Sequence, residues 1–400
     1  MLPTKFFDPP SGGSSNNASR LPQQQQQQQC ALPPLGMTGV MCKIGSLDIP
    51  QRGTIQYRIF RPRQLLSPEK PPLVVLHGGP LIPCNYLLPL AYVIVDRSII
   101  FYDQLGCGQS TKLVGPASSI LTTQEETTTT MDRNKKTTAV TTILDVNAMV
   151  NDLDCLIQHW NLKQFHLLGH SFGGILMFEY LKYCDIHANK TKSDRGTCRS
   201  AILASVPTST QLVEEEVQKM CQAMIAAGMD DDGDDDGDDG GDGDEVIPVG
   251  VTKKVPKCFR ETHECRMVPT PFPLMDSYSR AGPIKLRGLH SIGAYTATLS
   301  LSSTFPREDE ATVAAAAPPP APLQPTAPAT ASTKLQMPVL VLRGQHDFVT
   351  GVCVKDWDQL FQDCRYMTLA GCAHYGMLEN EVMFGSVLSS FLGDCDEKQS

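Results

Sequence analysis

The residues with the clearest chemical potential are the six at 169–174, Gly-His-Ser-Phe-Gly-Gly. They carry the pattern G-x-S-x-G; an apolar run, Phe165–Leu168, precedes them and a helix-like run, Ile175–Leu181, follows. A strand, a sharp turn and a helix form the setting in which a serine becomes an exposed nucleophile. A side chain at either glycine of the pattern would collide with the neighbouring strand or helix. The pattern therefore predicts Ser171 as a nucleophile, and a chance match in a glycine-bearing loop is the alternative.

A nucleophilic serine needs a base, and the base needs an acid that orients it. Where this turn occurs in enzymes, the chain order is serine, then aspartate or glutamate, then histidine. Elimination among the nine histidines leaves His374, which follows the predicted strand Arg365–Leu369. Asp347 follows the preceding predicted strand, Pro338–Leu342, and is the predicted acid.

Acyl transfer also needs two backbone N–H groups, because negative charge develops on the substrate oxygen in the transition state. Phe172, directly after the nucleophile, is predicted to supply one of them. Gly79, in the glycine loop that follows an apolar strand, is predicted to supply the other. Its neighbours His77, Gly78 and Pro80 are predicted to form a substrate loop. This chemistry requires no metal and no cofactor.

The elements that must position these residues alternate between strands and helices. Apolar residues from Ile143 to Trp160 recur at helical spacing and lead into the Ser171 strand. Such alternation predicts an α/β fold with a mostly parallel sheet, whose ligands bind at the carboxyl ends of the strands. Every candidate residue follows a strand. The other predicted elements are strands at Ile55–Phe60, Leu73–Leu76, Ser98–Tyr102 and Ala201–Ala204, and helices at Leu212–Ala227 and Met383–Leu392.

Composition divides the chain into a core that is interrupted by low-complexity sequence. The chain is predicted to begin with a disordered segment at 1–38 and a first core part at 39–210, which contains a polar surface insertion at 115–141. A helical cap is predicted at 211–333, with an acidic insertion at 230–245 and an Ala/Pro-rich linker at 311–331. A second core part at 334–393 and a tail at 394–400 complete the prediction.

Charge and cysteine content exclude several classes of function. The net charge of −9 comes mainly from the acidic run at 230–245, so the remaining chain is near neutral and offers no basic face for nucleic acid. That run lacks the EF-hand spacing and is interpreted as a solvated insertion. No apolar stretch reaches the ~18 residues that span a membrane. The 14 cysteines form no C-x-x-C pair, and without a recognisable secretory signal they predict free thiols in a cytoplasmic protein.

Together these motifs resemble the proline iminopeptidase family, serine peptidases of the α/β-hydrolase fold, over about 40–210 and 334–393. The loop at 77–80 is similar to the family's H-G-G-P-G, and residues 103–110 match its D-Q-x-G-x-G-x-S. Ser171, Asp347 and His374 fall on its catalytic positions. The resemblance implies release of an N-terminal residue, often proline, from short peptides. It also implies an inserted helical cap that shapes the pocket, and no cofactor.

Three positions depart from the family pattern. Leu81 replaces the last glycine of H-G-G-P-G, and Ala294 and Phe348 stand where related aminopeptidases carry glutamates that hold the substrate amine. An ammonium group needs a carboxylate partner, because an unpaired buried charge is costly. The carboxylates that could substitute are Glu179, Glu261, Glu264 and Asp276.

Three functions therefore stay open at this point. The first is a serine hydrolase that forms an acyl-enzyme, specifically an aminopeptidase acting on short peptides or aminoacyl amides with a free N-terminus. The second is a carboxylesterase acting on small esters. The third is a hydrolase-like binding protein with little turnover, a reading against which the complete Ser-Asp-His set argues.

Overall fold

The computed structural model describes residues 39–63, 70–112, 121–128, 137–187, 196–229, 256, 258–283, 286–299 and 334–398. The predicted disordered N-terminal segment, the acidic run and the Ala/Pro-rich linker lie outside these residues. All of the described residues belong to one compact unit.

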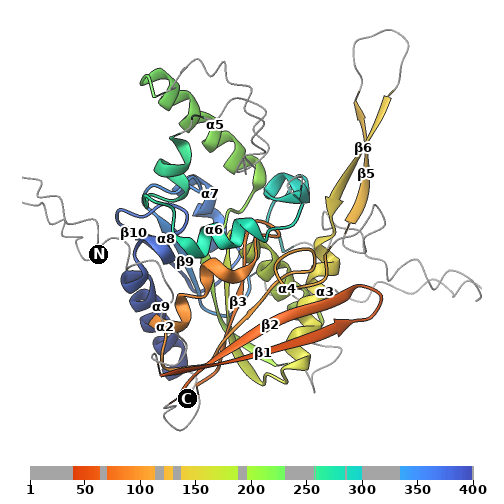
Figure 1. Ribbon diagram of the computed structural model, residues 1–400, viewed down its shortest axis with the longest axis vertical. Coiled ribbons are helices and arrows are strands. Elements are labelled where there is room, and N and C mark those ends of the chain that lie inside the picture. Colours follow the sequence, from red (N-terminus) through yellow and green to blue (C-terminus); the bar gives the residue numbers. More distant parts are fainter. Residues whose placement is uncertain are drawn as a thin grey trace, which may run out of the picture. The chain divides into compact units, whose positions relative to one another are not determined.

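An eight-stranded sheet runs through the middle of the fold (Figure 1). Its strands lie in the order β1-β2-β4-β3-β7-β8-β9-β10. β1 and β2 pair in antiparallel fashion, as do β2 and β4, whereas all pairs from β4 to β10 are parallel. The predicted α/β-hydrolase fold is confirmed. The strands are β1 Val40–Ile49, β2 Gly53–Pro62, β3 Leu73–Leu76, β4 Ile99–Tyr102, β7 Gln164–His170, β8 Thr197–Ala204, β9 Val339–Gly344 and β10 Cys364–Leu369.

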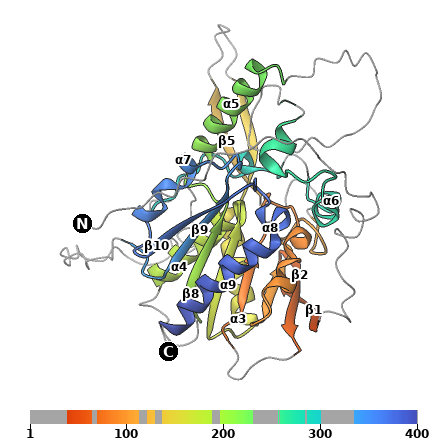
Figure 2. The ribbon, with the colours of Figure 1, turned by 90° about the vertical axis from the view of Figure 1, so that its left-hand side faces the viewer.

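Helices cover both faces of this sheet, and Figure 2 shows α9 on one side and α3 and α4 on the other. Alternate residues of β3 point to opposite faces, so Val74 packs in the core beneath α3 and α4 while Val75 packs in the core beneath α9. All four β3 residues are buried, which explains why this strand is a continuous apolar run. The helices of the two layers are α2 Leu90–Val93, α3 Val146–His159, α4 Phe172–His187 and α9 Glu381–Glu397.

Several predicted boundaries differ from the structure, and at two of them the residues belong to another kind of element. Ile143 belongs to β6 (Thr137–Leu144), which pairs with β5 (Leu121–Thr128) in a two-stranded sheet that begins inside the predicted polar insertion and extends three residues past its end at 141. α3 begins at Val146 because the Asp145 side chain accepts a hydrogen bond from the Ala148 N–H at 3.0 Å, which fixes the helix start. α9 continues to Glu397, into the segment predicted as a tail.

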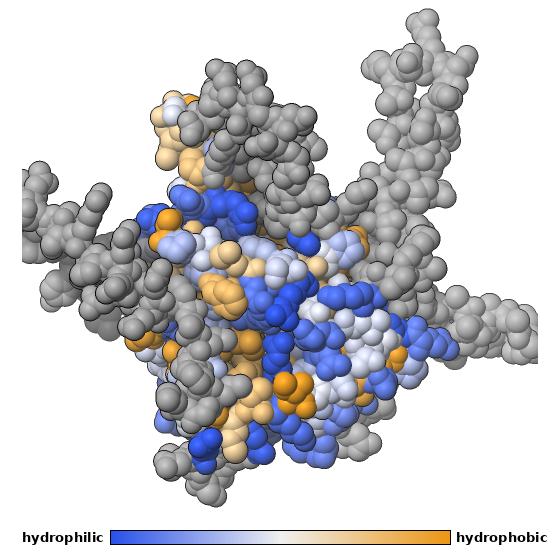
Figure 3. Space-filling model, viewed as in Figure 1, coloured by the Kyte–Doolittle hydropathy of each residue, from blue (hydrophilic) through white to orange (hydrophobic). Residues whose placement is uncertain are grey.

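The region predicted as a cap contributes helices that lie between β8 and β9 in the sequence. They are α5 Thr210–Ala226, η2 Arg260–Glu264, α6 Phe272–Ser279 and η4 Leu289–Ile292. The second core part adds the short helices α7 Gly351–Val354, η6 Lys355–Gln359 and α8 Gly376–Glu379. The first core part adds η1 Cys84–Leu87. Among the described helices, none has the length and apolar character to cross a bilayer. On the face in Figure 3, hydrophobic side chains of the described residues are scattered among hydrophilic ones.

Candidate active site

Ser171 stands on a sharp turn between β7 and α4. Its φ of 52° lies in the left-handed region, which costs a non-glycine residue free energy and marks a special position. A Cβ at Gly169 would come within 2.4 Å of the Gly174 Cα, and one at Gly173 within 2.3 Å of the Leu76 carbonyl oxygen. The collisions expected at both glycines of the motif are therefore confirmed, and the turn can form only with glycine at these positions.

Asp347 and His374 come together at the carboxyl ends of the neighbouring strands β9 and β10. The Asp347 Oδ1 atom lies 2.8 Å from His374 Nδ1, and both side chains are buried. The Val349 N–H donates to the same oxygen at 2.9 Å, while Asp347 Oδ2 has no hydrogen-bond partner among the described residues. This pairing assigns the proton of a neutral His374 to Nδ1 and leaves Nε2 free to accept one, as a general base must.

His374 also lies against the chain that carries Ser171. Its backbone carbonyl accepts a hydrogen bond from His170 Nε2 at 3.0 Å, and the two imidazole centroids are 4.8 Å apart. Within the described part of the chain, no hydrogen bond joins Ser171 Oγ to His374. Such bonds are often long before substrate binds.

The glycine loop lies directly beside the nucleophile. A Cβ at Gly78 would be 2.9 Å from the Ser171 Cβ, and one at Gly79, where φ is 113°, would be 2.7 Å from the Ile82 nitrogen. Phe172 is the first residue of α4, so its N–H has no acceptor within the helix. Both predicted oxyanion donors therefore come from segments that adjoin Ser171.

The D-Q-x-G-x-G-x-S motif braces this loop. The Gln104 N–H donates to His77 Nε2 at 2.9 Å, and the Gln104 side-chain amide donates to the His77 carbonyl at 3.0 Å. Because Nε2 accepts, the His77 proton is on Nδ1, which donates to the Gly78 carbonyl at 3.1 Å. Burial lowers the pKa of His77, which keeps the ring neutral. His77 therefore positions the loop.

Leu81 explains how the loop tolerates the loss of the family's glycine. Its φ is 62°, so the leucine adopts the left-handed conformation that glycine adopts without strain. The side chain is fully buried, and a Cβ at Gly282, in the cap region, would be 2.9 Å from it. The packing of this buried side chain between the loop and the cap region thus offsets the backbone strain at Leu81.

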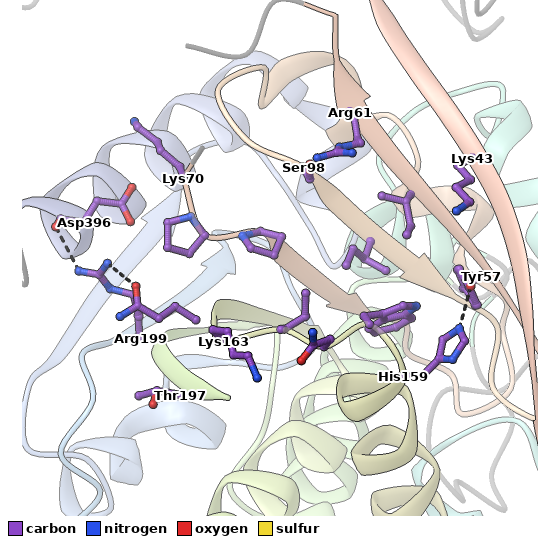
Figure 4. Close-up of a pocket in the computed structure, with 18 residues that line it drawn as sticks. Lys43, Tyr57, Arg61, Lys70, Ser98, His159, Lys163, Thr197, Arg199 and Asp396 are labelled. Carbon is purple, nitrogen blue, oxygen red and sulfur yellow. Dashed lines mark hydrogen bonds between the residues drawn. The ribbon is translucent and has the colours of Figure 1, made fainter. Parts of the chain in front are cut away.

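A cavity of about 1190 Å³ lies far from this chemistry. Its lining includes Gln164 and Thr197, the first residues of β7 and β8, whereas Ser171 follows the last residue of β7. Figure 4 shows Arg199 beside Asp396 at this end, where the guanidinium donates to the Asp396 carbonyl at 3.1 Å. The cavity therefore lies at the amino-terminal ends of the parallel strands, opposite the candidate active site.

Comparison with known proteins agrees with the fold and the motifs. A family model described as the alpha/beta hydrolase fold matches residues 71–190. The proline iminopeptidase of Lactobacillus helveticus is 26% identical over 343 residues, which cover 85% of this chain and 95% of that protein. The proline iminopeptidase of Lactobacillus acidophilus is 37% identical over 166 residues, 41% of this chain and 44% of that protein. The chain therefore has the alpha/beta hydrolase fold, and it is similar in sequence to proline iminopeptidases.

Solved structures share this fold. The crystal structure of proline iminopeptidase from Mycobacterium smegmatis superposes with a TM-score of 0.59 at 21% identity, covering 90% of this chain and 100% of that chain. The crystal structure of VinJ gives a TM-score of 0.56 at 22% identity, covering 88% and 99%.

The carboxylates that were candidates for binding a substrate amine are mostly paired with cations of the protein itself. Phe348, at a position where the resemblance implies a glutamate, stacks on the His374 ring with centroids 4.2 Å apart. Three of the four substitute carboxylates already have a cation and the fourth, Glu261, is exposed. The pairs are Glu179 with Lys182 at 2.6 Å, Glu264 with Arg260 at 2.9 Å and Asp276 with Arg280 at 2.9 Å.

Sequence reasoning missed two tyrosines around the site. Tyr86 contacts Gly78 and His170, and Tyr375 packs against His374 with ring centroids 5.4 Å apart. The signal for Tyr375 is its place directly after the predicted base. No local pattern singles out Tyr86, because its partners are distant in the sequence.

Proposed function

We propose that this protein is a serine hydrolase that works through an acyl-enzyme. The observation that carries the proposal is the hydrogen bond of 2.8 Å between Asp347 and His374, next to a serine on a strained turn. The set comes from three separate segments that follow three parallel strands, a convergence that packing alone does not require.

In the proposed reaction, Ser171 Oγ attacks the substrate carbonyl carbon while His374 Nε2 takes the hydroxyl proton. Asp347 holds the imidazole and stabilises the imidazolium that forms. The N–H groups of Gly79 and Phe172 hold the negative oxygen of the tetrahedral intermediate. Collapse of this intermediate expels the amine or alcohol, which receives the proton from His374. Water then attacks the acyl-Ser171 ester by the same route and releases the acid.

The proposed substrate is a short peptide or aminoacyl amide with a free N-terminal residue, proline-type by analogy with the proline iminopeptidases to which the chain is similar. The region at 211–333 would shape the pocket as a cap over the core parts at 39–210 and 334–393. Glu264 is the best placed of the four candidate carboxylates, because the Tyr278 hydroxyl contacts both Glu264 and, at 3.0 Å, the hydroxyl of Tyr375.

Esterase activity on small, uncharged acyl groups is the second candidate function. It is favoured by the phenylalanine at position 348 and by the cations that already pair with Glu179, Glu264 and Asp276. A carboxylate that a cation of the protein already neutralises gains less from a substrate ammonium group.

Three substrates separate these functions. The proposal predicts that prolyl p-nitroanilide is hydrolysed at least tenfold faster, in kcat/KM, than its N-acetylated form. Equal turnover of the free and blocked anilides, together with fast turnover of p-nitrophenyl acetate, would favour the esterase. No turnover of any of them by folded protein would favour the binding protein.

A further inference from the structure

A chain of hydrogen bonds crosses the site behind Ser171. The Tyr86 hydroxyl lies 2.8 Å from the Gly78 nitrogen and 2.8 Å from His170 Nδ1, and His170 Nε2 lies 3.0 Å from the His374 carbonyl oxygen. The side chains of Tyr86 and His170 are each about 1% exposed. Buried polar groups at these distances form a connected network whose members constrain one another.

Every proton in this network has one possible place. A carbonyl oxygen can only accept, so His170 Nε2 must carry the proton that is donated to His374. A neutral imidazole has one N–H, so Nδ1 accepts the Tyr86 hydroxyl proton. The hydroxyl oxygen then accepts the Gly78 N–H. Burial, with a smaller contribution from nearby His374, lowers the pKa of His170 well below its usual range, so the ring stays neutral.

The network joins the three segments that the proposed reaction needs. Gly78 belongs to the oxyanion loop, His170 precedes the nucleophile, and His374 is the proposed base. The far end of Tyr86 is anchored as well, because its N–H donates to Ser277 Oγ of α6 at 2.9 Å. A shift of Tyr86 would therefore move the oxyanion donors relative to the base.

Aromatic packing fixes the same groups from a second side. The Tyr375 ring lies 5.3 Å from Tyr86, 5.4 Å from His170 and 5.4 Å from His374, measured between centroids. The Tyr86 and His374 contacts are edge-to-face, a favourable geometry for aromatic pairs. A neutral His170 also matters electrostatically, because a positive charge 4.8 Å from His374 would oppose proton uptake by the base.

We propose that Tyr86 and His170 are positioning residues, which hold the Gly78–Gly79 loop and His374 at a fixed separation around Ser171. The inference rests on the proposed serine hydrolase function. The hydrogen bond from His170 to the His374 carbonyl positions the base. The hydrogen bonds of the Tyr86 hydroxyl, to His170 and from Gly78, position the oxyanion loop.

Tyr86→Phe tests the link to the oxyanion loop, with Tyr102→Phe as the matched control. Both tyrosines are buried, but the Tyr102 hydroxyl has no hydrogen-bond partner among the described residues. Tyr86→Phe should lower kcat about 10- to 100-fold with KM within about twofold, because small misplacements of reacting groups reduce the rate without changing binding. Tyr102→Phe should leave both constants unchanged.

His170→Gln and His170→Asn test the link to the base. The glutamine amide can reach as far as Nε2 and donate to the His374 carbonyl, whereas asparagine reaches only as far as Nδ1. We expect the glutamine variant to retain at least tenfold more kcat than the asparagine variant at equal folded fraction, measured by urea unfolding. Equal kcat in the two variants, or wild-type kcat in Tyr86→Phe, would overturn the inference. Wild-type protein without activity would instead contradict the proposed function.

Discussion

Leu81 offers a test of the conformational argument, because two of its variants should rank in an unusual order. Its side chain is fully buried, and truncating a buried leucine to alanine costs about 2.7–5 kcal/mol. Its φ of 62° costs an L-residue about 1–2 kcal/mol, which alanine also pays and glycine does not. We therefore expect Leu81→Ala to lower the free energy of unfolding by about 3 kcal/mol and Leu81→Gly by about 2 kcal/mol.

The order of these two variants reverses the usual one, since glycine within a helix or strand is about 0.5–1 kcal/mol less stabilising than alanine. Leu87 provides the control, because it is also fully buried but has no positive φ. Urea unfolding at 25 °C should give Leu81→Gly a higher free energy of unfolding than Leu81→Ala. At position 87 the order should be the opposite, with Leu87→Gly less stable than Leu87→Ala. If Leu81→Ala is as stable as Leu81→Gly or more so, the argument for a left-handed leucine fails.

Three further predictions follow from the described contacts. Gly78→Ala should lower kcat at least ~100-fold, because its Cβ would be 2.9 Å from that of Ser171; Gly393→Ala, where a Cβ meets nothing within 4 Å, should not change it. Asp347→Asn should lower kcat by about 10⁴-fold at pH 7, since the base loses the acceptor that sets its tautomer; an unchanged steady-state kcat would exclude this role. Burial lowers the pKa of His166 to about 4. Because the unfolded chain binds this proton first, urea titrations should show the unfolding free energy falling by about 3 kcal/mol from pH 6.5 to 4, and His166→Gln should lose that dependence.

The sequence could predict the core strands and the candidate triad because both depend on local pattern. Short apolar runs mark strands that are buried on two faces, and Asp347 follows such a run. His374 follows β10, an edge strand that is mostly half-buried or exposed. β1 was harder to predict, since Val40–Ile49 is mostly exposed or half-buried and lacks a clear alternation. The helix assigned from Ile143 was wrong by three residues, because a side-chain cap at Asp145 decides where α3 starts.

The features beyond sequence reasoning depend on contacts between distant residues. Tyr86 and His170 are 84 positions apart, and their hydrogen bond links them only after β3 and β7 pair. The pairing of Glu179 with Lys182 follows a helical spacing of three residues and could have been anticipated. The left-handed conformation of Leu81 could not, because leucine rarely adopts it and only the family comparison at this position hinted at it.

The central claim is that Ser171 is the nucleophile, and covalent labelling tests it most directly. Intact folded protein is treated with a fluorophosphonate, which phosphonylates an activated serine, and the adduct is located by peptide mass spectrometry. If Ser171 is the nucleophile, one adduct forms, on the peptide that contains Ser171. The adduct disappears in Ser171→Ala, and the Ser205→Ala control keeps it. An adduct that persists in folded Ser171→Ala, or no adduct on folded wild-type protein, would exclude Ser171 as the nucleophile.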